Sequence, residues 1–179
     1  MIAEINNLIA NAQQDKTLYS CVEDLLKFAD ETDKHFYLKD KTFDSIAKET
    51  EETVVEWLNS TTMESETKDE IKTNILSKLK DYIVVKELGQ LRKSHYIRYV
   101  CKHMHMGAPV LSRGGFLTTI DANEKGVFMW LRMGEKNFIK VNMNDKLIFQ
   151  KLKPNDTIIL ASLDYIKKFD DENLHNISS

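Results

Sequence analysis

The fold is decided by residues 94–153, which read SHYIRYVCKHMHMGAPVLSRGGFLTTIDANEKGVFMWLRMGEKNFIKVNMNDKLIFQKLK. Short runs of β-branched and aromatic residues alternate in this stretch with Gly, Asn and Asp, the residues that form turns. We therefore predict strands over residues 94–105, 115–121, 127–133, 137–142 and 146–152. Short turns join the last four, so we expect these strands to pair in order as an antiparallel meander.

The residues before this stretch are predicted to be helical. Apolar side chains recur at helical spacing in residues 2–13, 17–29, 41–59 and 61–86. After it, we expect a turn at Pro154–Asp156, a strand at Thr157–Ser162 and a closing helical turn at Leu163–Phe169. The predicted fold class is α+β, with a helical N-terminal region followed by a small antiparallel β-barrel-like module, SH3-like or similar. The predicted domains are an acidic helical region, 1–88, a basic β module, 91–169, and a polar tail, 170–179.

Charge is distributed unevenly along the 179 residues, although the net charge is only −3. Residues 1–90 carry a net charge of −8, residues 91–179 carry +5, and residues 91–153 alone carry +8. A basic module after an acidic one is typical of contact with a polyanion, but it also fits two halves that attract each other. The sequence leaves both interpretations open.

Two further patterns indicate an intracellular protein. Cys21 and Cys101 are the only cysteines and lie far apart in the sequence, which favours reduced thiols over a disulfide framework. The N-terminus lacks the basic start and apolar run of a signal peptide. No apolar run reaches the roughly 20 residues that a membrane-spanning helix needs.

One cluster has the composition of a metal site. Cys101, His103 and His105 alternate along a predicted strand, so their side chains share a face. A thiol and two imidazoles suit Zn²⁺ or copper, but no fourth ligand follows at a suitable spacing. The alternative is an edge strand with exposed histidines, and we predict no cofactor.

Catalytic patterns are absent from the sequence. The acidic residues of the β module lie in predicted turns, where solvation explains them. Residues 112–115 contain two glycines, but a strand follows and no Lys-Ser/Thr pair does, so a phosphate-binding loop is not indicated. We predict that the protein is not an enzyme.

Nucleic-acid binding is the alternative function that the residues suggest. Aromatic side chains on a small β module can stack on bases while cations bind the phosphates. The candidate stacking residues are Tyr96, Tyr99, Phe116, Phe128, Trp130 and Phe138. The candidate phosphate-binding residues are Arg92, Lys93, Arg98, Arg113, Arg132 and Lys140. The alternation of side chains, however, suggests that many of these aromatics form the core of the module instead.

The spacing of several runs resembles small β modules in uncharacterised proteins of large nucleocytoplasmic DNA viruses, the giant viruses of protists and algae. The runs are Tyr96–Tyr99, Gly114–Leu117, Val127–Arg132 and Leu147–Phe149, within residues 94–152. The resemblance implies a virus-encoded product of the host cytoplasm without catalytic residues, and such small proteins include minor capsid proteins. We therefore expect a non-enzymatic structural or interaction protein of the virion, with other protein subunits as partners. The alternative is a nucleic-acid-binding module in viral replication or packaging.

Overall fold

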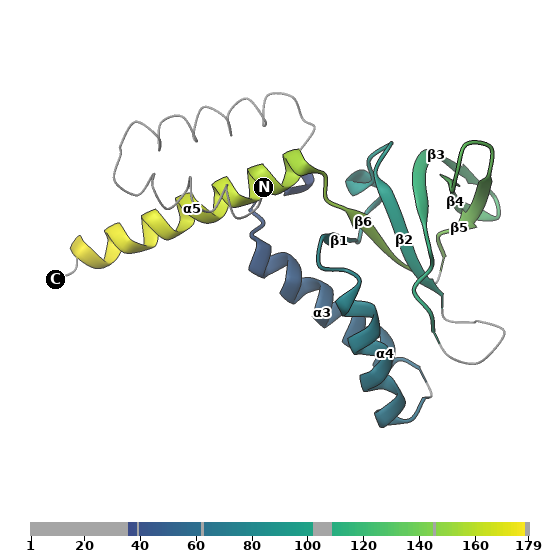
Figure 1. The fold of residues 1–179 in the computed structure, drawn as a ribbon, viewed down its shortest axis with the longest axis horizontal. Coiled ribbons are helices and arrows are strands. Elements are labelled where there is room, and N and C mark those ends of the chain that lie inside the picture. The colour runs from purple at the N-terminus through teal and green to yellow at the C-terminus, as the bar shows by residue number, and fades with distance from the viewer. Residues whose placement is uncertain (1–35, 39, 62, 102–108, 145, 178–179) are drawn as a thin grey trace. The chain divides into compact units, whose positions relative to one another are not determined.

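The centre of the structure is a sheet of six antiparallel strands with the order β1-β6-β2-β3-β4-β5 (Figure 1). This computed structural model describes residues 36–38, 40–61, 63–101, 109–144 and 146–177. The strands are β1 (Tyr82–Val85), β2 (Tyr96–Cys101), β3 (Gly115–Asn123), β4 (Gly126–Arg132), β5 (Phe138–Asn142) and β6 (Lys146–Lys151). The helices are η1 (Phe36–Leu38), α3 (Phe43–Asn59), α4 (Ser65–Ser77), η2 (Leu88–Gln90) and α5 (Pro154–Ile177).

The described residues belong to two compact units. Residues 46–152 form the first, which holds nearly all of α3, together with α4 and the whole sheet. The second consists of the described residues among 1–45 and 153–179, and it contains η1 and α5. The predicted domain boundary near residues 89–90 falls inside the first unit. The helices predicted at residues 2–13 and 17–29 lie outside the described residues.

The sheet carries an apolar core on each of its faces. On the helix-side face, the α3–α4 hairpin packs against β1, β6 and β2. On the opposite side, which we call the inner face, residues of β2, β3, β4, β5 and β6 form a second cluster. Both clusters are mainly aliphatic. The helix-side cluster is Val54, Leu58, Ile75, Leu79, Tyr82, Val84, Val100, Leu111 and Phe149. The inner cluster is Leu91, Ile97, Leu117, Met129, Leu131, Val141 and Ile148.

The predicted helix over residues 61–86 is wrong in its last part. α4 ends at Ser77, where the backbone N–H of Lys78 donates to the carbonyl of Ile75 and that of Leu79 donates to the carbonyl of Leu76. The run Tyr82–Val85 then forms β1, which pairs with β6. Tyr82 and Val84 are buried towards the helices, while Ile83 is buried on the other face. A strand that is buried on both faces has no polar alternation, so its sequence resembles a buried helical segment.

The predicted meander is confirmed for β3, β4 and β5 but is wrong for β6. β5 does not pair with β6; β6 lies instead between β1 and β2. The reason is burial: Ile148, Phe149 and Gln150 are all buried, as in a central strand, whereas Phe138 and Lys140 of β5 are exposed, as at an edge. The sheet ends in β1 and β5 and is not closed. The α+β class is therefore confirmed, but a closed barrel is not.

The C-terminal strand and turn predicted after residue 153 are also wrong. Pro154 begins α5, and Asp156 Oδ2 accepts a 2.6 Å hydrogen bond from the backbone N–H of Lys153. Proline is favoured in the first turn of a helix, and a carboxylate there satisfies a backbone donor that has no helical partner. Residues 157–162 and most of the predicted tail therefore belong to α5. No helix in the described part of the chain has the length and apolar character needed to cross a membrane.

Candidate functional site

The helix-side face of the sheet continues over β3, β4 and β5, beyond the cluster formed with α3 and α4. The register places its side chains in three rows across these strands. A bulge between Leu117 and Thr119 adds one residue to β3, so that Thr119 lies opposite Trp130 and on the same face of the sheet. We call this surface the aromatic–basic face. Its rows are Phe116–Arg132–Phe138, Thr119–Trp130–Lys140 and Asp121–Phe128–Asn142.

The first row exposes two aromatic rings on either side of a cation. Phe116 is 45% exposed and Phe138 is 51% exposed, and Arg132 lies between them on β4. Phe116 is also held from β2, because the Tyr96 ring contacts it edge-on with centroids 5.1 Å apart. Tyr96 is fixed in turn, because its hydroxyl donates a 2.9 Å hydrogen bond to the carbonyl of Arg113. The row is therefore exposed but partly preorganised.

The second and third rows are joined by polar contacts of Trp130. Trp130 Nε1 donates a 2.6 Å hydrogen bond to Asp121 Oδ2. The ammonium of Lys140 lies 4.4 Å from the centroid of the Phe128 ring and 5.4 Å from that of Trp130. These distances are those of cation–π interactions, which contribute about 0.5–1 kcal/mol at exposed sites. The contacts orient the two rings and the one ammonium relative to each other.

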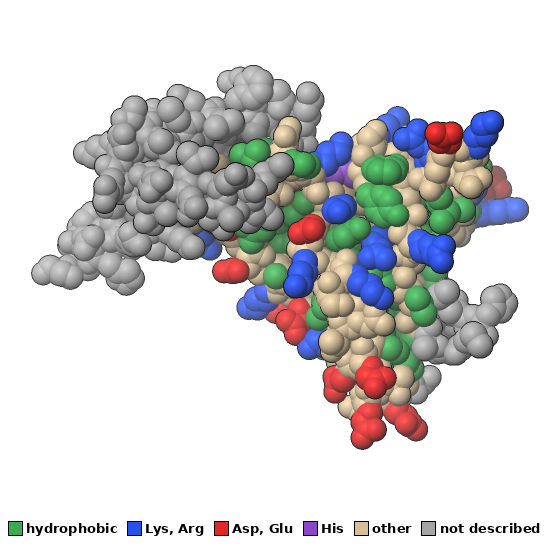
Figure 2. Space-filling view, in the orientation of Figure 1, with side chains coloured by type: hydrophobic (Ala, Val, Ile, Leu, Met, Phe, Trp, Pro, Cys, Tyr) green, Lys and Arg blue, Asp and Glu red, His purple; other side chains and the backbone are tan. Residues whose placement is uncertain are grey.

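The charge on this face is positive. Arg132 and Lys140 are exposed, and no ion pair joins either of them to a carboxylate within the described ranges. The acidic residues of this unit lie mostly elsewhere: residues 46–77, from α3 and α4, contain eight Asp or Glu and three Lys. Figure 2 shows Lys and Arg side chains around the strands and Asp and Glu side chains gathered at the lower tip of the hairpin.

The structure brings together two of the six predicted phosphate-binding residues, Arg132 and Lys140, on one face. Arg98 lies on the same side of β2, but its Nε donates to the carbonyl of Ser112 at 3.0 Å, and its guanidinium also donates to the carbonyl of Lys78. Arg113 is exposed in the turn before β3.

The remaining two cations lie outside the three rows. The backbone N–H of Arg92 donates to Gln150 on the inner face, and its guanidinium donates to the carbonyls of Gly89 and Leu91. Lys93 is exposed in the turn that leads to β2. Sequence spacing does not show which of these cations are available to bind a phosphate. That depends on whether backbone carbonyls remote in the sequence accept hydrogen bonds from them, as they do from Arg98.

The aromatic residues divide in the same way between the faces. Tyr99 packs against the inner cluster, where burial raises the pKa of its hydroxyl, with a smaller contribution from Cys101. Phe116, Phe128, Trp130 and Phe138 lie on the aromatic–basic face. The prediction that many aromatics form the core of the module is therefore wrong for these four. They alternate along the strands with Leu117, Met129, Leu131 and Val141, which fill the inner core.

The predicted metal cluster lies partly outside the described residues. Cys101 is the last residue of β2 and is half-buried, whereas His103 and His105 are not described. No group of three or more His, Cys, Asp or Glu side chains that could hold a metal ion occurs within the ranges that the structure describes. The metal site stays a prediction.

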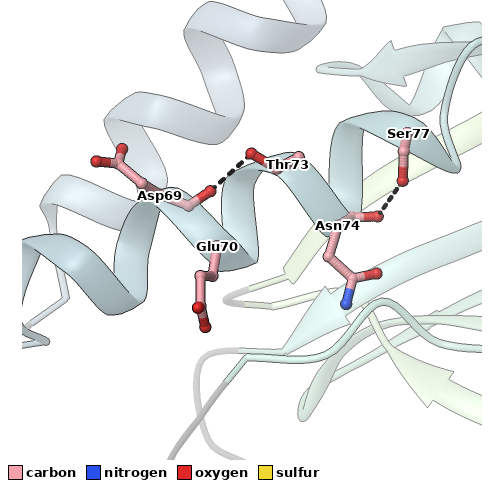
Figure 3. Close-up of a pocket in the computed structure, with 5 residues that line it drawn as sticks. All are labelled: Asp69, Glu70, Thr73, Asn74 and Ser77. Atoms are coloured by element: carbon pink, nitrogen blue, oxygen red, sulfur yellow. Dashed lines mark hydrogen bonds between the residues drawn. The ribbon is translucent and has the colours of Figure 1, made fainter.

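A hollow on α4 is lined by five polar residues and is open to solvent (Figure 3). The hydroxyl of Thr73 donates to the carbonyl of Asp69, and that of Ser77 donates to the carbonyl of Asn74. Such bonds to the preceding turn are common for Ser and Thr in helices. The hollow is therefore an ordinary helix surface and not a built site.

Comparison of the chain with protein-family models, curated proteins and solved structures gave no match. The function must therefore be argued from the aromatic–basic face itself.

Proposed function

We propose that this chain is a non-enzymatic interaction protein and that the aromatic–basic face is its binding surface. The observation that carries the proposal is the first row, where two half-exposed phenylalanines flank an exposed arginine. Burying Phe116 and Phe138 in the core would have been more favourable for folding, since each buried apolar side chain contributes about 1.5–3 kcal/mol. Their exposure beside Arg132 favours a role in binding.

The composition of the face supports this proposal. Aromatic residues and arginine are enriched in binding surfaces, where they carry most of the binding energy. The face is also a rigid part of the fold: it lies on three paired strands whose opposite side is filled by buried Met129, Leu131 and Val141. A preorganised surface loses little entropy when it binds a partner. Other protein subunits are one class of partner that such a surface fits.

A role in the virion of a large DNA virus, and a location in host cytoplasm, remain part of the proposal. They rest on the resemblance of residues 94–152 alone. The absence of an enzymatic role is likewise a proposal. It is supported by the site described above, in which the one carboxylate, Asp121, is engaged by an indole N–H and lies on an open face.

A parallel selection experiment tests the proposal and does not require the partner to be identified first. A random peptide display library and a random single-stranded oligonucleotide pool are selected on the full-length protein and, separately, on a Phe116→Ser, Phe138→Ser variant. The variant should keep the melting temperature within a few degrees, because both side chains lie outside the two cores. We expect ligands that are enriched on the wild type and lost on the variant. Equal enrichment on both proteins, in both libraries, would contradict the proposal.

A further inference from the structure

We infer that the occupant of the aromatic–basic face is a single-stranded nucleic acid, and this inference rests on the binding role proposed above. The first row alternates an aromatic ring, a cation and an aromatic ring across three neighbouring strands. Neighbouring strands are about 4.8 Å apart, so Phe116 and Phe138 lie on either side of Arg132 in the register. A nucleic-acid strand repeats the same alternation, as base, phosphodiester and base.

The second row extends this pattern. Trp130 presents an indole that Asp121 fixes through its Nε1–H, and Lys140 stands next to it on β5. The Lys140 ammonium lies over the Phe128 and Trp130 rings and has no carboxylate partner among the described residues. A phosphate that approaches the face attracts this ammonium away from the rings and leaves the indole open to a base. Lys140 thus provides a second cation for phosphate binding, in the row next to that of Arg132.

Charge complementarity favours a polyanion over a neutral or basic peptide. The three rows contain two cations, Arg132 and Lys140, and one carboxylate, Asp121, whose Oδ2 already accepts the indole N–H. Arg113, whose backbone carbonyl accepts the Tyr96 hydroxyl, adds an exposed cation just before β3. Phosphate neutralisation releases counterions from the nucleic acid, which gives a favourable contribution that no uncharged partner supplies.

The exposed rings select single strands over duplexes. Bases in a duplex are stacked on each other and cannot reach rings that stand on a sheet surface, whereas unpaired bases can stack on them. Only a few cations line the face, and Arg98 is engaged by the carbonyls of Ser112 and Lys78. The binding we expect is therefore sequence-tolerant, with a dissociation constant on the order of 10⁻⁵ M at physiological salt.

Fluorescence anisotropy with the full-length chain tests the inference. The probes are a dye-labelled 12-nucleotide single strand of mixed sequence, which fits the usual range of about 4–16 nucleotides for small β modules, and a hairpin duplex of equal charge. Phe138→Ala should weaken single-strand binding about 5- to 150-fold, the range for loss of one base–aromatic stack. Arg132→Gln should lower the salt dependence of log K by about one unit.

The matched control is Lys93→Gln, which removes the same charge from an exposed position outside the three rows. It should leave the affinity and the salt dependence close to the wild-type values. Thermal melting of each variant checks that the fold is intact. Equal binding of the duplex and the single strand, or a loss no larger for Arg132→Gln than for Lys93→Gln, would overturn the inference.

The two proposals fail in different ways. If the display selection yields peptides that depend on Phe116 and Phe138 while no oligonucleotide binds, the face is an interaction surface and this inference is wrong. If neither library yields a ligand that depends on these residues, both proposals are wrong. Self-association that saturates the face and is abolished by Phe138→Ala would also overturn the nucleic-acid assignment, and sedimentation velocity measures it directly.

Discussion

Trp130 Nε1 donates a 2.6 Å hydrogen bond to Asp121 Oδ2 across the β3–β4 hairpin. Asp121 lies opposite Phe128 in the register, so this contact runs diagonally to the residue two positions further along β4. Diagonal pairs of this kind are within reach of long aromatic side chains. The contact orients the indole on the aromatic–basic face of β4.

The first prediction concerns this contact. Asp121→Ala removes the acceptor and should free the indole to change rotamer, at a cost of about 1 kcal/mol in the free energy of unfolding. In a Trp57→Phe background, Trp130 is the only tryptophan, so steady-state anisotropy of its fluorescence measures the mobility directly. Glu124→Ala is the control, because Glu124 is exposed in the following turn. An unchanged anisotropy in Asp121→Ala would show that the contact does not hold the ring.

The second prediction compares adjacent residues of β4. Met129 is fully buried in the inner cluster, whereas Trp130 lies on the aromatic–basic face. Met129→Ala should therefore lower the free energy of unfolding by about 2–5 kcal/mol, as large-to-small changes in cores do. Trp130→Ala removes a larger side chain but should cost less, because no enclosed cavity forms. Chemical denaturation of both variants measures the difference, and a larger loss for Trp130→Ala would contradict the assignment of the faces.

Sequence reasoning locates the strands of residues 94–153 well, because each is a β-rich run between turn residues. It also predicts that β3, β4 and β5 pair in order, since short turns leave little choice. It fails at Tyr82–Val85, where a buried strand lacks the alternation that distinguishes strands from helices. It fails again at Pro154, where the first turn of α5 has the same Pro, Asn and Asp residues as a loop.

The candidate site is predictable only in part, because both faces of β4 are largely apolar. Alternation shows that Phe128, Trp130 and Arg132 share one face, while Met129 and Leu131 share the other. Both sets are largely apolar, so the sequence does not show which faces solvent. The choice depends on partners remote in sequence: Leu117 and Val141 meet Met129 and Leu131 on the inner face, whereas α3 and α4 cover only β1, β6 and β2.

Gly114 lies directly before β3 and has a positive φ, and the third prediction tests whether this position requires glycine. Its φ of +84° is rarely adopted by residues with a side chain, and a Cβ atom there would contact the backbone carbonyl of Ile97. Gly114→Ala should cost about 2 kcal/mol or more in the free energy of unfolding. Gly134→Ala is the matched control, since nothing lies within 4 Å of its added Cβ. Equal melting temperatures for the two variants would contradict the conclusion that a side chain at position 114 is strained.

Thr50 offers the opposite case, a substitution that should stabilise the protein. Its hydroxyl oxygen in α3 is buried and has no hydrogen-bond partner within the described part of the chain. Thr50→Val keeps the shape and removes the unsatisfied polar atom, so we expect a gain of about 1 kcal/mol in the free energy of unfolding. Thr53→Val is the control on the same helix, because the Thr53 hydroxyl donates to the carbonyl of Glu49 at 2.7 Å. A loss of stability in Thr50→Val equal to that in Thr53→Val would show that the hydroxyl of Thr50 is satisfied.

The last prediction concerns alkaline pH. Burial raises the pKa of Tyr99 above its ordinary value of 10.0, and the nearby Cys101 raises it further. Because the pKa is higher in the folded state than in the unfolded one, the stabilising effect of the neutral hydroxyl is complete below about pH 10. Above that pH the unfolded chain loses its proton first, so the free energy of unfolding falls as the pH rises towards the folded-state pKa.

Tyr99→Phe removes this group and should therefore reduce the alkaline loss of stability. We expect the difference in free energy of unfolding between variant and wild type to be constant from pH 7 to 9 and to shift in favour of the variant above pH 10. Urea denaturation at a series of pH values measures it. Tyr82, whose pKa burial also raises despite the opposing charge of Arg98, should contribute in the same direction. A difference between Tyr99→Phe and wild type that does not change up to pH 11 would show that Tyr99 ionises equally readily in both states.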